Sequence, residues 1–186
     1  PNMAQVPAVY SPYGKECRGL WTVDDVSKYR LVGVDASGLE LRCLAHYMND
    51  PEYTNIVLTG DVHTANQERA GLKTRDQAKT FIYAFLYGAG AAKIGKVVGG
   101  TAKHGQQLIT RFLNNMPALK HLRMLVSKEA AGDTIKALDG RLLHIRSEHA
   151  ALNTLLQGAG AIVCKQWLVH IMERVIKAKL DARLVA

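Results

Sequence analysis

The stretch "TRDQAKTFIYAFLYGAG", residues 74–90, decides how the chain around it folds. Thr74 followed by Gln77 is the pattern of a helix N-cap, in which the hydroxyl accepts a hydrogen bond from a backbone N–H of the first turn. Gly88 and Gly90 follow the apolar run and are suited to ending a helix. The stretch therefore predicts one helix of about three turns.

Four side chains able to form hydrogen bonds recur at every fourth position of this helix: Arg75, Lys79, Tyr83 and Tyr87. Because steps of four residues drift by only about 40° around a helix, they form one slanting stripe about 18 Å long. Phe81 and Phe85 point largely elsewhere and are predicted to anchor the helix. Cations at the helix N-terminus favour anions, and the phenols suit a sugar or a base. The stripe predicts a nucleoside triphosphate site.

The rest of the chain predicts a mostly helical α+β fold. Helical spacing of apolar residues predicts further helices at 38–48, about 103–115, 117–131 and about 148–180. Residues 29–35 predict a short strand that ends on Asp35. Residues 138–146 predict a turn at Asp139-Gly140 followed by a strand. The organisation is thus a helical lobe inserted between two parts that carry strands.

The formal net charge of +8 lies entirely in the middle of the chain. Between Asp76 and Glu129 there are eight Lys and Arg residues and no acid, and elsewhere 16 basic residues balance 16 acidic ones. Such a long stretch without acids favours a polyanionic partner. No apolar run reaches the roughly 20 residues of a membrane span. The three cysteines form no Cys-x-x-Cys pair, which favours buried thiols over disulfides or zinc.

Carboxylates supply a second constellation in "VDASGLELR". Asp35 stands at the end of the predicted strand and Glu40 at the beginning of the next helix. A carboxylate followed by small residues is suited to a hard Mg²⁺ ion that phosphates approach. His63, in "GDVHT", lies twelve residues before Arg75 and is a candidate third phosphate contact.

These motifs together resemble the family A, or polymerase I-like, DNA polymerases. "DASGLELR" resembles the first motif of that family, and "RDQAKTFIYAFLYGAG" resembles the second, Arg-x-x-x-Lys-x-x-x-Tyr-x-x-x-Tyr-Gly. "PNMAQVP", "GDVHT" and "HAALNTLLQGAGA" fit in the same order, so the resemblance covers essentially the whole chain. The wording is most similar to the replicative polymerases of short-tailed bacteriophages.

The resemblance implies template-directed DNA synthesis by a two-metal mechanism. Asp35 and the backbone carbonyl of Ala36 would bind Mg²⁺, of which the complete enzyme holds two ions. His63, Arg75 and Lys79 would hold the incoming dNTP triphosphate, and Lys79 would also protonate the pyrophosphate leaving group.

The same resemblance implies contacts to the sugar, the base and the DNA. Tyr83 would face the sugar, Tyr87 would stack near the nascent base pair, and Glu40 would close the sugar pocket against a 2′-hydroxyl. Four residues are similar to the segment that contacts primer–template DNA: Arg146, His149, Asn153 and Gln157.

The resemblance also implies a division into subdomains and a missing part. Residues 1–58 and 136–186 would be palm, and 59–135 fingers. The family's third motif, a His-Asp-Glu sequence that supplies a second metal-binding aspartate, does not occur in this sequence. The chain is therefore expected to be a palm-and-fingers fragment, inactive alone, whose partners are primer–template DNA, dNTP and the remaining polymerase segments. It is expected to act in the bacterial cytoplasm if phage-encoded, with no membrane partner.

Other function classes fit the sequence less well. "GAAKIGKV", residues 90–97, nearly matches a P-loop, but Val97 replaces the hydroxyl residue that binds Mg²⁺ and a helix is predicted before it. The serious alternative is a non-catalytic DNA-binding or assembly module of a split polymerase, which the basic middle segment alone would support. Asp35 together with Glu40 favours the enzyme, because a mere binder has no use for carboxylates beside a phosphate site.

Overall fold

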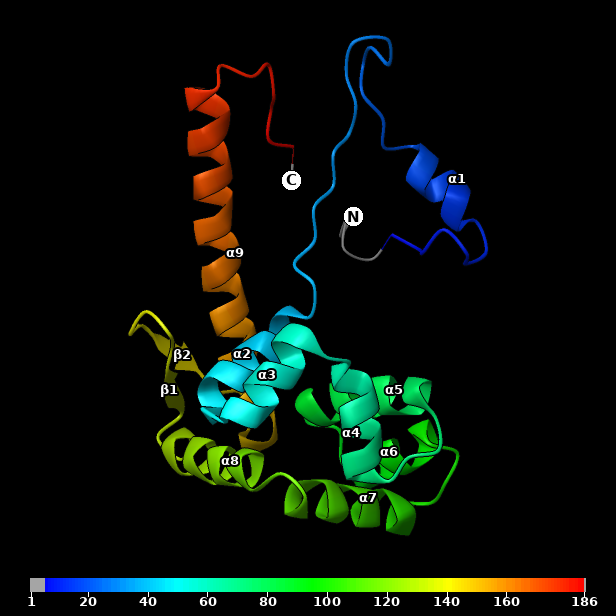
Figure 1. The fold of residues 1–186 in the computed structure, drawn as a ribbon, viewed down its shortest axis with the longest axis vertical. Coiled ribbons are helices and arrows are strands. Elements are labelled where there is room, and N and C mark those ends of the chain that lie inside the picture. Colours follow the sequence, from blue (N-terminus) through cyan, green and yellow to red (C-terminus); the bar gives the residue numbers. More distant parts are fainter. Residues whose placement is uncertain (1–5, 186) are drawn as a thin grey trace. The chain divides into compact units, whose positions relative to one another are not determined.

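The structure is a computed structural model that describes residues 6–185 (Figure 1). It divides into two compact units, residues 1–37 and 38–186. Over residues 6–37 the smaller unit holds one short helix, α1 (Gly14–Gly19). The rest of its described chain is irregular, and the aliphatic side chains of Leu31, Val32 and Val34 are exposed.

The strand predicted at residues 29–35 is therefore wrong: this segment is extended but belongs to no sheet. β-rich composition gives a strand only when a second strand accepts its backbone hydrogen bonds. Within residues 6–185 the single strand pair lies elsewhere in the chain. Asp35 consequently follows an irregular segment and does not stand at a strand end.

The larger unit contains the remaining elements in chain order. They are α2 (Leu39–Met48), α3 (Pro51–Thr59), α4 (Val62–Ala70), α5 (Arg75–Leu86), α6 (Ala91–Val97), α7 (Ala102–Asn114), α8 (Pro117–Ala130), β1 (Thr134–Lys136), β2 (Leu142–His144), the 3₁₀ helix η2 (Glu148–Ala150) and α9 (Ala151–Lys177). The predicted helices at 38–48, 74–87, 103–115 and 117–131 are confirmed, and the long final helix begins three residues later than predicted. The mostly helical α+β fold class is confirmed.

Local signals account for the ends of the central helices. The Thr74 hydroxyl caps α5 by accepting a hydrogen bond from the Gln77 N–H at 3.2 Å. Pro117 begins α8, where its missing N–H costs nothing. The turn predicted at Asp139-Gly140 joins β1 to β2, which pair antiparallel, and Gly140 has a φ of 87°.

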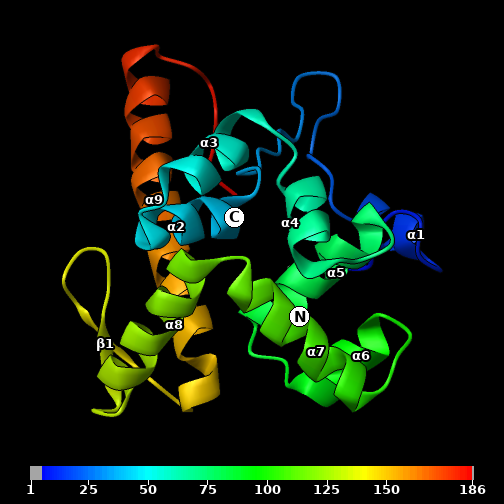
Figure 2. The same cartoon turned by 60° about the horizontal axis from the view of Figure 1, so that its bottom comes forward.

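Helices α4, α5, α6 and α7 pack against one another, and Figure 2 shows α5, α6 and α7 side by side. Helices α2, α3, α8 and α9 pack with the hairpin as a second group. The two groups are joined by contacts of α3 with α4 and of α7 with α8.

Aromatic rings hold the first group together. Phe81 and Phe85 of α5 are buried, as predicted, and both pack edge-to-face with Phe112 on α7, with ring centroids 5.1 Å and 5.5 Å apart. Such edge-to-face pairs contribute roughly 0.5–1.5 kcal/mol each beyond the burial of their area. The back of α5 is thereby fixed, and its other face is left for the site.

Candidate functional site

The predicted stripe of α5 forms one face of the helix. Arg75 and Lys79 are exposed on its first turns, Tyr83 is half-buried, and Tyr87 at the C-cap is 48% exposed. The rings of Tyr83 and Tyr87 lie 6.4 Å apart, so the two phenols form one continuous surface. The stripe thus runs from a cationic end to an aromatic end, as the sequence predicted.

The aromatic end meets α2 through one hydrogen bond. Glu40 lies in the first turn of α2, and its Oε1 accepts a hydrogen bond from the Tyr87 hydroxyl at 3.0 Å. Burial raises the pKa of Tyr87, and the bonded Glu40 carboxylate raises it further. Burial, followed by the Glu40 charge, also raises the pKa of Tyr83. Both phenols therefore stay protonated at neutral pH and present hydroxyl donors beside a carboxylate.

His63 of α4 joins the same surface. Its ring centroid lies 6.1 Å from that of Tyr83, and within the described chain its buried Nδ1 has no hydrogen-bond partner. Burial lowers the pKa of His63, and the Arg75 and Lys79 charges lower it further against the opposing effect of Asp61. These effects favour the neutral imidazole, in which one ring N–H can donate to a phosphate.

Asp61 is a site residue that the sequence analysis missed. Its carboxylate accepts two hydrogen bonds from Arg75, with Nε–Oδ2 at 2.6 Å and Nη2–Oδ1 at 3.2 Å. The same carboxylate caps α4 by accepting from the N–H groups of His63 and Thr64. One side chain thus fixes the cation of α5 relative to the imidazole of α4.

The electrostatics of Asp61 follow from these contacts. The Arg75 guanidinium, and then the Thr64 hydroxyl, hold the pKa of this carboxyl well below its ordinary value. The sequence held one usable signal: in "GDVHT" an aspartate directly precedes a helix, which is the preferred N-cap position. Nothing in the sequence predicted the hydrogen bonds between Asp61 and Arg75, which are 14 residues apart.

The segment predicted to contact DNA lies partly against the end of α5. A Cβ atom at Gly88 would lie 2.4 Å from the carbonyl oxygen of His149, so only glycine allows the two backbones to approach this closely. Asn153 and Gln157 are one turn apart on α9, half-buried and exposed respectively. Arg146 is exposed in the loop after β2. The structure brings the His149 backbone to α5, and leaves the role of the four side chains a prediction.

Asp35 and Ala36 belong to the smaller unit, and are therefore described separately from α5. The Asp35 side chain is exposed. A carboxylate oxygen is a ligand of the type Mg²⁺ prefers, so the donor fits the ion. Residues 6–185 contain no group of three His, Cys, Asp or Glu side chains placed to hold a metal ion. Asp35 and the Ala36 carbonyl would thus supply part of a ligand set.

This surface is cationic and bears an imidazole at one end, and it is phenolic with a carboxylate at the other. These are the types of group that contact phosphates, sugars and bases. Comparison with known proteins agrees with this chemistry: DNA polymerase family A matches residues 1–186, and the chain belongs to that family.

The relatives with a named activity include phage enzymes. The "DNA-directed DNA polymerase" of Enterobacteria phage T3 and that of Escherichia phage T7 are each 48% identical to this chain, over 97% of its length. The chain spans 29% of the length of each of these two relatives. The predicted resemblance to the family and to bacteriophage polymerases is confirmed.

A solved structure shows the same fold at lower identity. The POL domain of Pol1 from M. smegmatis, in complex with DNA primer-template and dNTP, matches with a TM-score of 0.81 and 19% sequence identity. The match covers 100% of this chain and 36% of that one. In the part of the chain that the structure describes, no helix is both long and apolar enough to cross a membrane.

Proposed function

We propose that this chain is the nucleotide-binding part of a DNA-directed DNA polymerase, which transfers a nucleotide from a dNTP to the 3′-hydroxyl of a primer paired with a template. The observation that carries the proposal is the order of groups along α5, from Arg75 and Lys79 to Tyr83 and Tyr87. This order matches the order of triphosphate, sugar and base in a dNTP. Membership of the family and the names of the phage relatives support the same activity.

The cationic end is proposed to hold the triphosphate. The guanidinium of Arg75 is bound along one side by Asp61, which leaves its Nη1 donors for a phosphate. The exposed ammonium of Lys79 lies one turn further on and would donate a proton to the departing pyrophosphate, where negative charge develops. His63 would add a neutral N–H donor.

The aromatic end is proposed to select the sugar. Tyr83 would face the ribose, Tyr87 would lie under the new base pair, and Glu40 would exclude a 2′-hydroxyl. The hydrogen bond of Tyr87 to Glu40 supports this assignment, because it holds the carboxylate beside the phenol. Replacing Glu40 with Ala is therefore expected to admit ribonucleotides.

Mg²⁺ and segments beyond this chain complete the proposal. Asp35 and the Ala36 carbonyl would hold the ion together with ligands from the remaining polymerase. Bound Mg²⁺ supplies neutralisation of phosphate charge and activation of the primer hydroxyl. Exposed apolar side chains on the distal half of α9, such as Val169 and Ile176, support a partner segment there.

The subdomain limits and the DNA contacts belong to the same proposal. Residues 1–58 and 136–186 would form palm and 59–135 fingers, with Arg146, His149, Asn153 and Gln157 along the primer–template. The polymerase would act inside the bacterial host of a phage.

The test is a chimaeric polymerase in which this chain replaces the matching segment of the phage T7 relative. The chimaera should extend a primer, and the isolated chain should extend nothing. Lys79→Ala should lower the rate of nucleotide addition by about 10²–10³, as expected for loss of one group that stabilises the transition state. Arg75→Ala should chiefly weaken dNTP binding, whereas Lys96→Ala, an exposed lysine of α6, should change neither.

Two outcomes would contradict the proposal. If Lys79→Ala and Arg75→Ala lost only DNA affinity, with nucleotide addition unchanged at saturating DNA, the stripe would be a DNA-backbone contact. If the chimaera bound primer–template yet added no nucleotide, the chain would be a non-catalytic DNA-binding or assembly module.

A further inference from the structure

Helix α7 carries a polar hollow that the nucleotide site does not use. The hollow is open, has a volume of about 690 Å³, and is lined almost entirely by this one helix. Its two cations are Lys103 and Arg111. Its other lining residues carry amides or a hydroxyl: Gln106, Gln107, Thr110, Asn114 and Asn115. No lining residue is acidic and none is apolar.

The composition of this hollow follows from the two faces of α7. Gly105, Leu108 and Phe112 are buried against the rest of the helical group, and the opposite face carries the lining residues. An ordinary solvated helix face mixes charges of both signs. Here the face lies inside the stretch from residue 77 to 128, which contains eight cations and no acid. The hollow is therefore positive without any compensating carboxylate on its own helix.

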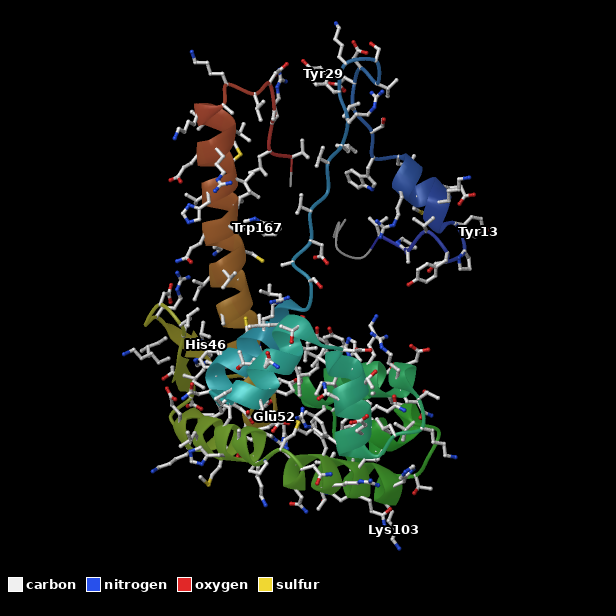
Figure 3. The ribbon with its side chains drawn as sticks, in the orientation of Figure 1. Tyr13, Tyr29, His46, Glu52, Lys103 and Trp167 are labelled. Atoms are coloured by element: carbon white, nitrogen blue, oxygen red, sulfur yellow. The ribbon has the colours of Figure 1, made fainter. Side chains whose placement is uncertain are left out.

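Both cations are placed to meet a ligand. Figure 3 shows Lys103 extending away from the ribbon at the first turn of α7. The Arg111 guanidinium rests on the backbone at the end of α4, because a Cβ at Gly71 would lie only 2.2 Å from its Cζ. The two residues are eight positions apart, a rise of about 12 Å along the helix. That length spans several phosphates of a strand stacked at about 3.4 Å per nucleotide.

We propose that this hollow binds a single strand of DNA, through its phosphates at Lys103 and Arg111 and through unpaired base edges at the amides. Arg, Lys, Thr, Asn and Gln side chains are the groups that contact nucleic-acid backbones, and amides also pair with base edges. The inference goes beyond the proposed function, since none of these residues belongs to the stripe of α5 or to the segment from Arg146 to Gln157.

The chemistry favours a single strand over the other polyanions. A protein partner needs buried aromatic or aliphatic anchors at the centre of its interface, and this lining offers none. In duplex DNA the Watson–Crick edges of the bases are paired with the opposite strand, so side-chain amides reach only the groove edges. An unpaired strand is thin enough to enter and exposes base edges that the amides of Gln106, Gln107 and Asn114 can meet. The Asn115 amide already donates to the Arg69 carbonyl at 2.8 Å.

The experiment measures binding of a fluorescein-labelled, mixed-sequence 12-nucleotide single strand to the chain by anisotropy, without Mg²⁺ or dNTP. Each phosphate contact to a single strand contributes about 0.7 to the slope of log affinity against log salt. The double variant Lys103→Gln/Arg111→Gln should therefore lower that slope by about 1.4. At 0.1 M salt its affinity should fall about 25-fold, since each contact is worth about fivefold between 0.1 M and 1 M.

Matched controls separate the hollow from general positive charge. Lys96→Gln/Lys120→Gln removes two charges from the same stretch but outside the hollow, and should lower affinity less than about threefold. Because Arg111 packs on Gly71, a second variant tests the site without touching that contact. Gln107→Glu adds one negative charge to the lining and should weaken binding, whereas Gln166→Glu on α9 should not.

Three results would overturn the inference. Equal losses in the two double variants would mean that only overall charge matters. An equal loss with a blunt duplex of the same sequence would mean that the hollow binds duplex backbone. If an oligoglutamate peptide bound instead, and its binding alone were lost in the Lys103→Gln/Arg111→Gln variant, the partner would be an acidic protein segment. Shifts of the Gln106 and Gln107 side-chain NH₂ signals on adding the single strand would support the proposal directly.

Discussion

Replacing Gly88 with alanine tests whether the end of α5 must touch the segment before α9. Gly88 has a φ of +76°, and a Cβ built on it would lie 2.4 Å from the carbonyl oxygen of His149. The left-handed conformation costs a non-glycine residue roughly 1–2 kcal/mol, and forcing an extra methyl into a filled space costs about 1–3 kcal/mol. The sum predicts that Gly88→Ala lowers the free energy of unfolding by about 2–5 kcal/mol.

Gly90 provides the control two residues away. Its φ is −71°, and a Cβ there would meet nothing within 4 Å. Gly90 is the N-cap of α6, where alanine is less favourable than glycine, so Gly90→Ala should lower the free energy of unfolding by no more than about 1 kcal/mol. Both variants are compared with the unchanged chain by urea unfolding followed by circular dichroism at 222 nm.

Two outcomes of the urea unfolding would contradict the predicted effect of Gly88→Ala. If Gly88→Ala unfolded at the same urea concentration as Gly90→Ala, with an unchanged slope, the close approach of Gly88 to His149 would not exist. If it unfolded earlier but with a changed slope, the substitution would have altered the compactness of one state, and the worked magnitude would not apply.

Three further predictions rest on other contacts. Asp61→Asn should destabilise the chain at neutral pH, because Arg75 lowers the pKa of this carboxyl. In acid-unfolding curves, the difference in stability from the unchanged chain should persist above the ordinary aspartate pKa of about 4 and disappear as the pH falls further. Phe112→Ala should lower the free energy of unfolding by about 3–5 kcal/mol in urea, since its ring is fully buried against α5, and a loss below about 1 kcal/mol would contradict the aromatic packing. In the chimaeric polymerase, Tyr83→Phe should reduce incorporation of dideoxynucleotides relative to dNTPs about 10- to 100-fold, because a hydrogen bond to a charged oxygen is worth roughly 1–3 kcal/mol. An unchanged ratio in competitive incorporation would contradict the proposed contact of Tyr83 with the sugar.

The helices that the sequence predicted are those with signals inside the helix itself. Thr74 with Gln77 predicted the start of α5, and Pro117 predicted the start of α8. The turn at Asp139-Gly140 announced the hairpin in the same way, since its chemistry is complete within a few residues. Elements of this kind follow from short-range rules, and a single sequence is enough to find them.

The failures include three helices that were not predicted, α3, α4 and α6, although Asp50 and Asp61 cap the first two. The other failures concern features that need a distant partner. Residues 29–35 have strand composition but lie unpaired, because a strand depends on a neighbour that composition does not name. No role was predicted for Asp61 from the sequence, although its carboxylate accepts hydrogen bonds from Arg75, 14 residues away. Glu40 and Tyr87 form a hydrogen bond although they are 47 residues apart in the sequence. The family resemblance identified both as candidate site residues but did not predict this contact.

On α5 the residues that stabilise the fold and the residues proposed to bind the nucleotide lie on different faces. Its stability comes from Phe81 and Phe85 on the buried face, whereas Lys79 and the phenols lie on the other. Exposed positions usually change stability by no more than about 0.5 kcal/mol when substituted. Libraries that vary the exposed Lys79 and Tyr87, and keep the half-buried Tyr83 that packs against the core, should therefore sample several nucleotide preferences at nearly constant fold stability. This helix is thus a favourable starting point for engineering the proposed substrate choice.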